Sequence, residues 1–83
     1  MRYDLRDVDA WIDESGSYTW NASYHIGEYK TNASDEKRAF LYQLKKRGIY
    51  CKRGRCKVYF DGDVYELQDR KTGEPLFAAI PLY

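Results

Sequence analysis

The strongest structural signal in the chain is the stretch SYTWNASYHIGE, residues 17–28, in which aromatic or aliphatic residues alternate one by one with polar residues or glycine. A strand places successive side chains on opposite faces, so this period of two predicts a half-buried β-strand. Residues 4–13 alternate less regularly, and the polar connector Glu14-Ser15-Gly16 is typical of a hairpin. The chain is therefore expected to open with a β-hairpin.

Residues 34–48, SDEKRAFLYQLKKRG, carry the spacing and the end signals of an amphipathic helix. Ser34 can accept hydrogen bonds from the free N–H groups of the first turn, and Gly48 suits the left-handed position that ends many helices. Basic residues in the last turn match the negative end of the helix dipole. The buried stripe of this helix is expected to consist of Phe40, Leu41 and Leu44.

Three further strands are expected at residues 56–60, 63–69 and 75–80, which are rich in aromatic and aliphatic side chains. Asp61-Gly62 is typical of a type I′ turn. The order ββαβββ predicts an α+β fold, an antiparallel sheet of four to five strands with one helix packed on one face. A chain of 83 residues is expected to form a single small globular domain. The predicted core consists of Val8, Ala10, Ile12, Trp20, Tyr24, Ile26, Phe40, Leu44, Val64, Leu67, Phe77 and Ile80.

The net charge of +1 conceals an uneven distribution along the chain. Residues 37–60 hold nine basic side chains and no acidic one, while the segments on either side are acidic. No apolar run approaches the roughly 18 residues that a membrane span requires, and the first residues lack the apolar segment of a secretory signal. A cytoplasmic protein without a membrane partner is therefore expected.

The basic segment also contains interleaved tyrosines, and this combination suits nucleic-acid binding. Lysine and arginine neutralise phosphates, and aromatic faces stack on unpaired bases, so DNA or RNA is the first expected partner. The alternative is a solvated helix end beside a charged turn that protects a sheet edge from aggregation. The candidate nucleic-acid-binding residues are Arg38, Tyr42, Lys45, Lys46, Arg47, Tyr50, Lys52, Arg53, Arg55 and Lys57.

A second candidate surface is the acidic face of the first strand. An exposed tryptophan among carboxylates is typical of a contact hot spot, and it would serve an inhibitor or adaptor that binds a protein partner. A homodimer is a variant of this interpretation, because the acidic and basic regions of two copies attract each other. The alternative is a solvent-facing strand side. The candidate protein-binding residues are Asp7, Asp9, Trp11 and Asp13.

The remaining chemistry-bearing residues predict neither a metal site nor a catalytic site. Cys51 and Cys56 supply only half of a structural zinc site, and His25 is the only histidine. A disulfide across this segment is an alternative, although a cytoplasmic location favours reduced thiols. The chain has neither a G-x-S-x-G turn nor a glycine-rich phosphate loop. It is therefore predicted not to be an enzyme and to need no cofactor.

The segments DVDAW, YTWN, SDEKRAF, LKKRGI and DRKTGEPLFAAIP, taken in this order, resemble small proteins encoded on conjugative or phage-like mobile elements of Gram-positive bacteria. The resemblance spans most of the chain but contains no catalytic motif that could be assigned to individual residues. It implies a bacterial cytoplasmic protein with an accessory role, in maintenance of the element or in evasion of host defences.

Overall fold

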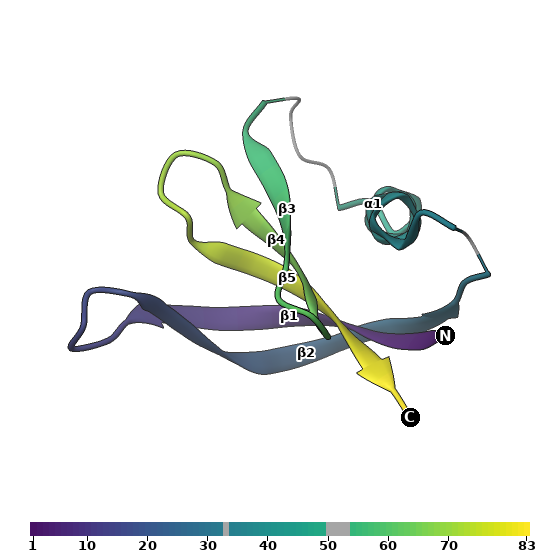
Figure 1. Ribbon diagram of the computed structural model, residues 1–83, viewed down its shortest axis with the longest axis horizontal. Helices are drawn as coiled ribbons and strands as arrows, with labels where there is room; N and C mark the ends of the chain where they lie inside the picture. The colour runs from purple at the N-terminus through teal and green to yellow at the C-terminus, as the bar shows by residue number, and fades with distance from the viewer. Residues whose placement is uncertain (33, 50–53) are drawn as a thin grey trace.

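The computed structural model describes residues 1–32, 34–49 and 54–83 and contains one antiparallel sheet and one helix (Figure 1). The strands lie in the order β2-β1-β5-β4-β3. The predicted α+β fold with ββαβββ order is confirmed. The elements are β1 (Arg2–Ile12), β2 (Tyr18–Lys30), α1 (Glu36–Lys46), β3 (Cys56–Phe60), β4 (Tyr65–Asp69) and β5 (Pro75–Leu82).

Helix α1 joins the two edges of the sheet. β2 and β3 are the edge strands, so the chain between them has to pass over one face of the sheet. Figure 1 shows α1 beside the end of the β1–β2 hairpin that carries the N-terminus, while the turn of the hairpin extends away from it. We call residues 2–6 with 25–30 the covered end of the hairpin, and residues 8–12 with 18–22 its far end.

The main core lies between α1 and the sheet, where it includes residues of the covered end and of the neighbouring strands β5 and β4. Phe40 and Leu44 of the helix pack with the side chains of Tyr3, Leu5, Tyr29, Leu67 and Ala79. Of the predicted core, the buried residues are Val8, Phe40, Leu44 and Leu67, and the partly buried ones are Ala10, Trp20, Ile26, Val64, Phe77 and Ile80.

Glu36, in the first turn of α1, ties the helix to the sheet. Its Oε2 accepts hydrogen bonds from the hydroxyl of Tyr3 at 2.8 Å and from that of Tyr65 at 3.5 Å. The Tyr3 ring stacks on that of Tyr29, with 5.4 Å between centroids. Burial and the adjacent Glu36 carboxylate raise the pKa of Tyr3. These tyrosines therefore form a protonated, hydrogen-bonding layer beneath the helix.

The start and the buried stripe of α1 differ from the prediction. The N-cap is Asp35 rather than Ser34, and its Oδ1 accepts from the backbone N–H three residues further on at 3.1 Å. Leu41 was expected in the buried stripe but is 42% exposed. The buried residues of α1 are Phe40 and Leu44.

The end of α1 follows the prediction. Gly48 has φ 79°, in the left-handed region where a glycine is favoured. The Gly48 amide donates to the Lys45 carbonyl at 3.0 Å, and the Ile49 amide donates to the Leu44 carbonyl at 2.9 Å. This pair of bonds is the Schellman ending.

Within the described ranges, no helix has the length and apolar character needed to cross a membrane.

Two register shifts between β1 and β2 explain the largest error in the predicted core, which is at Tyr24. They fall between Leu5 and Arg6 and between Arg6 and Val8. At each shift β2 contributes an extra residue, so its side chains change faces relative to a regular alternation. Tyr24 was expected to be buried and is 76% exposed. Ile12 was also expected to be buried, but it lies at the far end, beyond α1, and is 59% exposed.

The connection between β3 and β4 is not the predicted type I′ turn. That turn needs two residues with positive φ, and only Gly62, at 101°, has one here. Instead, Asp61 Oδ1 accepts from the backbone N–H groups of Asp63 at 3.3 Å and Val64 at 3.0 Å. The side chain of Asp61 therefore organises a four-residue loop, and β4 begins at Tyr65.

Candidate nucleic-acid interface

The outward face of α1 brings together four of the predicted binding residues. Arg38, Tyr42, Lys45 and Lys46 recur at helical spacing on the side opposite Phe40 and Leu44, and all four are exposed. Tyr42 is 62% exposed, and the exposed Leu41 lies beside it. We call these five residues, 38, 41, 42, 45 and 46, the α1 surface. It offers three cations around a flat aromatic ring.

The cations of the α1 surface are not neutralised by the protein itself. In the described part of the chain, the ion pairs are Arg2–Glu28 and Arg6–Asp4, and Asp4 also contacts the His25 ring, all within the β1–β2 hairpin. The nearest carboxylates along the helix make other bonds: Glu36 accepts from the tyrosine hydroxyls, and Asp35 accepts from a backbone N–H as the N-cap. The three positive charges therefore remain available to an external anion.

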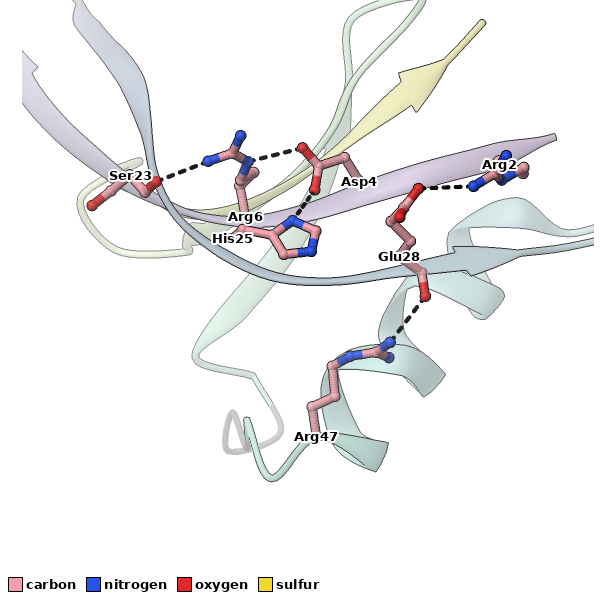
Figure 2. A network of polar contacts seen from close by, with 7 residues as sticks. All are labelled: Arg2, Asp4, Arg6, Ser23, His25, Glu28 and Arg47. Atoms are coloured by element: carbon pink, nitrogen blue, oxygen red, sulfur yellow. Dashed lines mark hydrogen bonds and ion pairs between the residues drawn. The ribbon is translucent and has the colours of Figure 1, made fainter.

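Arg47 was predicted to bind nucleic acid, but its guanidinium makes bonds inside the protein. NH1 donates to Gln43 Oε1, and NH2 donates to the Glu28 carbonyl at 3.1 Å. Figure 2 shows this arginine reaching from the end of α1 to β2. A Cβ at Gly27 would lie 2.8 Å from the guanidinium, so the glycine leaves the space that Arg47 occupies. Arg47 fastens the helix to the sheet edge.

The other predicted cations lie apart from the α1 surface. The neighbours of Lys57 in β3, Cys56 and Val58, pack against the core on the helix side, so exposed Lys57 points to the opposite face. Arg55 is exposed at the start of β3, and its carbonyl accepts from the Arg70 amide at 2.8 Å. Three further candidates, Tyr50, Lys52 and Arg53, lie outside the described residues.

Arg55 belongs to a second cationic group that the sequence did not indicate. It lines a recess of about 300 Å³ together with Arg70 and Lys71 from the β4–β5 turn. Asp69 is in the same recess, and the backbone N–H groups of Thr72 and Lys71, with Arg55 nearby, lower the pKa of its carboxyl. The recess thus combines three cations with one carboxylate. Only the pairing of β3 with β4 brings these residues together.

A groove between α1 and the end of β2 adjoins the α1 surface. It has a volume of about 570 Å³, and Arg38 and Tyr42 line it together with Tyr29, Lys30 and Gln43. Tyr29 is 7% exposed, and its hydroxyl has no hydrogen-bond partner among the described residues. Burial and the Glu36 carboxylate raise the pKa of Tyr29, so its hydroxyl remains a proton donor.

The predicted protein-binding residues lie along β1 and the hairpin turn. Trp11 is 46% exposed and Asp9 is exposed. Two of the carboxylates make local bonds: Asp7 Oδ1 accepts from the Val8 amide at 2.9 Å, and Asp13 Oδ1 accepts from the Ser15 hydroxyl at 2.6 Å. The turn bonds lower the pKa of Asp13. Trp11 and Asp9 are therefore the available part of this surface.

The sheet face opposite α1 carries a polar network at the covered end (Figure 2). Asp4 Oδ1 lies 2.6 Å from His25 Nδ1, and its Oδ2 accepts from Arg6 Nε at 2.8 Å. Arg6 also donates to the Ser23 carbonyl at 2.9 Å, across the register shift. Burial alone would raise the pKa of Asp4, but the bonds from Arg6 and His25 outweigh it and lower the pKa.

A second polar pair on this sheet face joins β2 to β4. Glu66 is 6% exposed, and the Trp20 indole donates a hydrogen bond to its carboxylate. β1 and β5 lie between these strands, so the Trp20 side chain reaches across both, on the face where Glu66 pairs with Ala78. Burial raises the pKa of Glu66, and the Trp20 bond offsets this only in part.

The structure corrects the expectation of reduced thiols, because Cys56 is disulfide-bonded. Cys51 lies outside the described residues. Across the three described ranges, no group of at least three histidine, cysteine, aspartate or glutamate side chains is placed to hold a metal ion.

The chain matches no protein-family model, no curated protein and no solved structure.

Proposed function

We propose that this protein is a non-catalytic nucleic-acid-binding module that contacts phosphates through the α1 surface. The observation that carries the proposal is the set of three exposed cations, Arg38, Lys45 and Lys46, with no ion pair to any described carboxylate. Phosphate neutralisation needs such unpaired cations, because each contact releases condensed counterions from the nucleic acid. An accessory role on a bacterial mobile element is consistent with this function and is part of the proposal.

The distribution of charge gives the bound nucleic acid a preferred position. The acidic residues of the far end and of the hairpin turn lie away from α1 (Figure 1), and they would repel a polyanion. Arg47 supports this surface without contacting the ligand, since its guanidinium holds the end of α1 against β2. The α1 surface is therefore the part of the protein that attracts the nucleic acid, and it is held rigidly against the sheet.

The test is a fluorescence-anisotropy titration with labelled DNA and RNA at about 50 and about 200 mM salt. Three phosphate contacts predict a roughly 20-fold loss of affinity for a single strand over this range. The double variant Lys45→Glu/Lys46→Glu is expected to lose at least about tenfold at the lower salt concentration. The matched control Lys57→Glu/Lys71→Glu changes the net charge equally, away from the α1 surface, and is expected to bind nearly as the parent does.

Two results would overturn this proposal. One is the absence of binding to every nucleic acid at low salt. The other is an equal loss in both double variants, which would assign the attraction to net charge rather than to α1.

A second candidate function is binding of a protein partner, or of a second copy, through the far end of the hairpin. Trp11 and Ile12 are 46% and 59% exposed, on opposite faces of β1, and Asp9 lies beside Trp11 on its face. Exposed aromatic and aliphatic side chains at one tip are typical of contact sites. The same titration separates the two functions, because this surface predicts no salt-dependent binding to nucleic acid.

A further inference from the structure

Tyr29, one of the residues that line the groove between α1 and β2, has a buried hydroxyl without a hydrogen-bond partner among the described residues. The Tyr29 hydroxyl is buried and makes no bond to any described residue. A buried polar group without a partner costs stability, so such groups in native proteins are normally bonded to protein, water or ligand. The other tyrosines of this layer, Tyr3 and Tyr65, bond Glu36. Of these three tyrosines, only Tyr29 has a hydroxyl without a partner among the described residues.

The rest of the groove offers groups that suit one nucleotide. Its volume of about 570 Å³ lies within the roughly 300–1,000 Å³ range of small-molecule sites. Tyr42 provides an exposed ring, and Arg38, one helical turn earlier, provides a guanidinium at the same rim. Gln43, which also lines the groove, accepts from Arg47 through Oε1, so its amide nitrogen is left as a second donor.

We propose that this groove binds one unpaired nucleotide of a single strand, with the base stacked on Tyr42 and accepting a hydrogen bond from the Tyr29 hydroxyl. The adjacent phosphate lies at Arg38, and the strand continues over Lys45 and Lys46. This inference rests on the proposed nucleic-acid-binding function and adds the class of ligand, since only an unpaired base can leave its neighbours and enter a groove. Base stacking on an aromatic ring also contributes affinity with little dependence on sequence.

The experiment compares a short oligothymidylate with a duplex of equal length, using the parent protein and the Tyr29→Phe and Tyr42→Ala variants. The parent is expected to bind the single strand more tightly. Tyr29→Phe removes only the hydroxyl and is expected to weaken oligothymidylate binding about five- to tenfold. Tyr42→Ala is expected to weaken it by about tenfold or more. Neither variant should change the affinity for the duplex, which is expected to contact only the three cations of the α1 surface, since its paired bases cannot stack on Tyr42.

Two controls keep the result interpretable. Lys45→Ala removes a phosphate contact and is expected to weaken single-strand and duplex binding alike. Chemical denaturation of Tyr29→Phe should show unchanged or higher stability, because the variant lacks a buried hydroxyl that has no partner. A weaker affinity in a variant that is at least as stable as the parent can only come from the lost contact with the ligand.

The outcomes separate this inference from the function on which it rests. Equal affinity for both probes, with no effect of Tyr29→Phe or Tyr42→Ala, would overturn the proposal that the groove binds a nucleotide and leave phosphate binding by α1 intact. The Tyr29 hydroxyl would then be satisfied by water. No binding of either probe would overturn both.

Discussion

The covered end and the far end of the β1–β2 hairpin have similar alternating sequences but opposite surroundings. At the covered end Tyr3, Leu5 and Tyr29 are buried beneath α1. At the far end Trp11 and Ile12 are exposed, although they are as apolar as the buried residues. The two ends also differ in charge, since the basic helix packs on the covered end, whereas Asp9 and the turn residues Asp13 and Glu14 lie at or next to the far end.

This difference shows that alternation defines the two sides of a strand but not what covers them. Burial at the covered end depends on α1, which packs there because the chain has to pass from one sheet edge to the other. In the described part of the chain no helix covers the far end, where Val8 is buried and Trp20 is half-buried on the face opposite α1. We therefore expect substitutions at the covered end to affect stability, and those at the far end to affect contacts with other molecules.

The largest expected difference is between Leu5→Ala and Ile12→Ala, which remove comparable apolar groups from the two ends. Leu5 is fully buried, so its truncation is expected to destabilise the protein by about 2–5 kcal/mol. Ile12 is 59% exposed, and its truncation is expected to cost less than about 0.5 kcal/mol. Chemical denaturation of both variants measures the difference. Similar losses would mean that the far end is covered in solution, which would favour a homodimer through this surface.

The sequence predicted the elements well and their surroundings less well, for reasons that particular residues show. The order ββαβββ and the Gly48 ending follow from local signals, because period and turn chemistry act over a few residues. Tyr24 was misplaced because a register shift depends on the partner strand. Leu41 was misplaced because the width of the helix contact depends on the sheet beneath it.

The candidate site was also only partly predictable. The spacing of Arg38, Tyr42, Lys45 and Lys46 predicted a common exposed face, which the structure shows. The internal role of Arg47 depends on Gly27, 20 positions earlier in the chain, and no local pattern indicates it. Similarly, no local pattern distinguishes Tyr29 from the other strand tyrosines. Only the fold shows that Tyr3 and Tyr65 bond Glu36, while the Tyr29 hydroxyl has no partner among the described residues.

Arg47 holds the helix against the covered end of the hairpin. Arg47→Ala removes the bonds to Gln43 and Glu28 and is expected to cost about 1–2 kcal/mol, against less than about 0.5 kcal/mol for the neighbouring exposed Lys46→Ala. Gly27→Ala is expected to cost about 1 kcal/mol, because its Cβ would displace the guanidinium.

A double-mutant cycle by chemical denaturation distinguishes this mechanism from strain in the strand itself. In the Arg47→Ala background, Gly27→Ala is expected to be neutral or to stabilise by up to about 1 kcal/mol, since alanine is better than glycine within a strand. Additive losses from the two substitutions would contradict the proposed contact.

The smallest expected effects are two pH dependences of opposite sign, one from each end of the hairpin. Asp4, at the covered end, has a lowered pKa. The stability that Asp4 contributes is present above its ordinary pKa of 3.8 and is lost as the pH falls through its pKa in the folded protein. Glu66, held by Trp20 of the far end, has a raised pKa. The carboxyl of Glu66 keeps its proton to a higher pH in the folded protein than in the unfolded chain. The free energy of unfolding therefore falls as the pH rises from the ordinary pKa of 4.5 towards the pKa in the folded protein.

Stability measured against pH for the parent, Asp4→Asn and Glu66→Gln separates these two contributions. Asp4→Asn is expected to lose stability at neutral pH and to converge with the parent in acid. Glu66→Gln is expected to be more stable than the parent at neutral pH and to converge with it as the pH is lowered. Neither slope can exceed about 1.4 kcal/mol per pH unit for a single group. If Glu66→Gln instead destabilised the protein at neutral pH, the bond between Trp20 and the ionised Glu66 carboxylate would outweigh the cost of burying that charge. Trp20 would then stabilise the far end much as Arg47 stabilises the covered end.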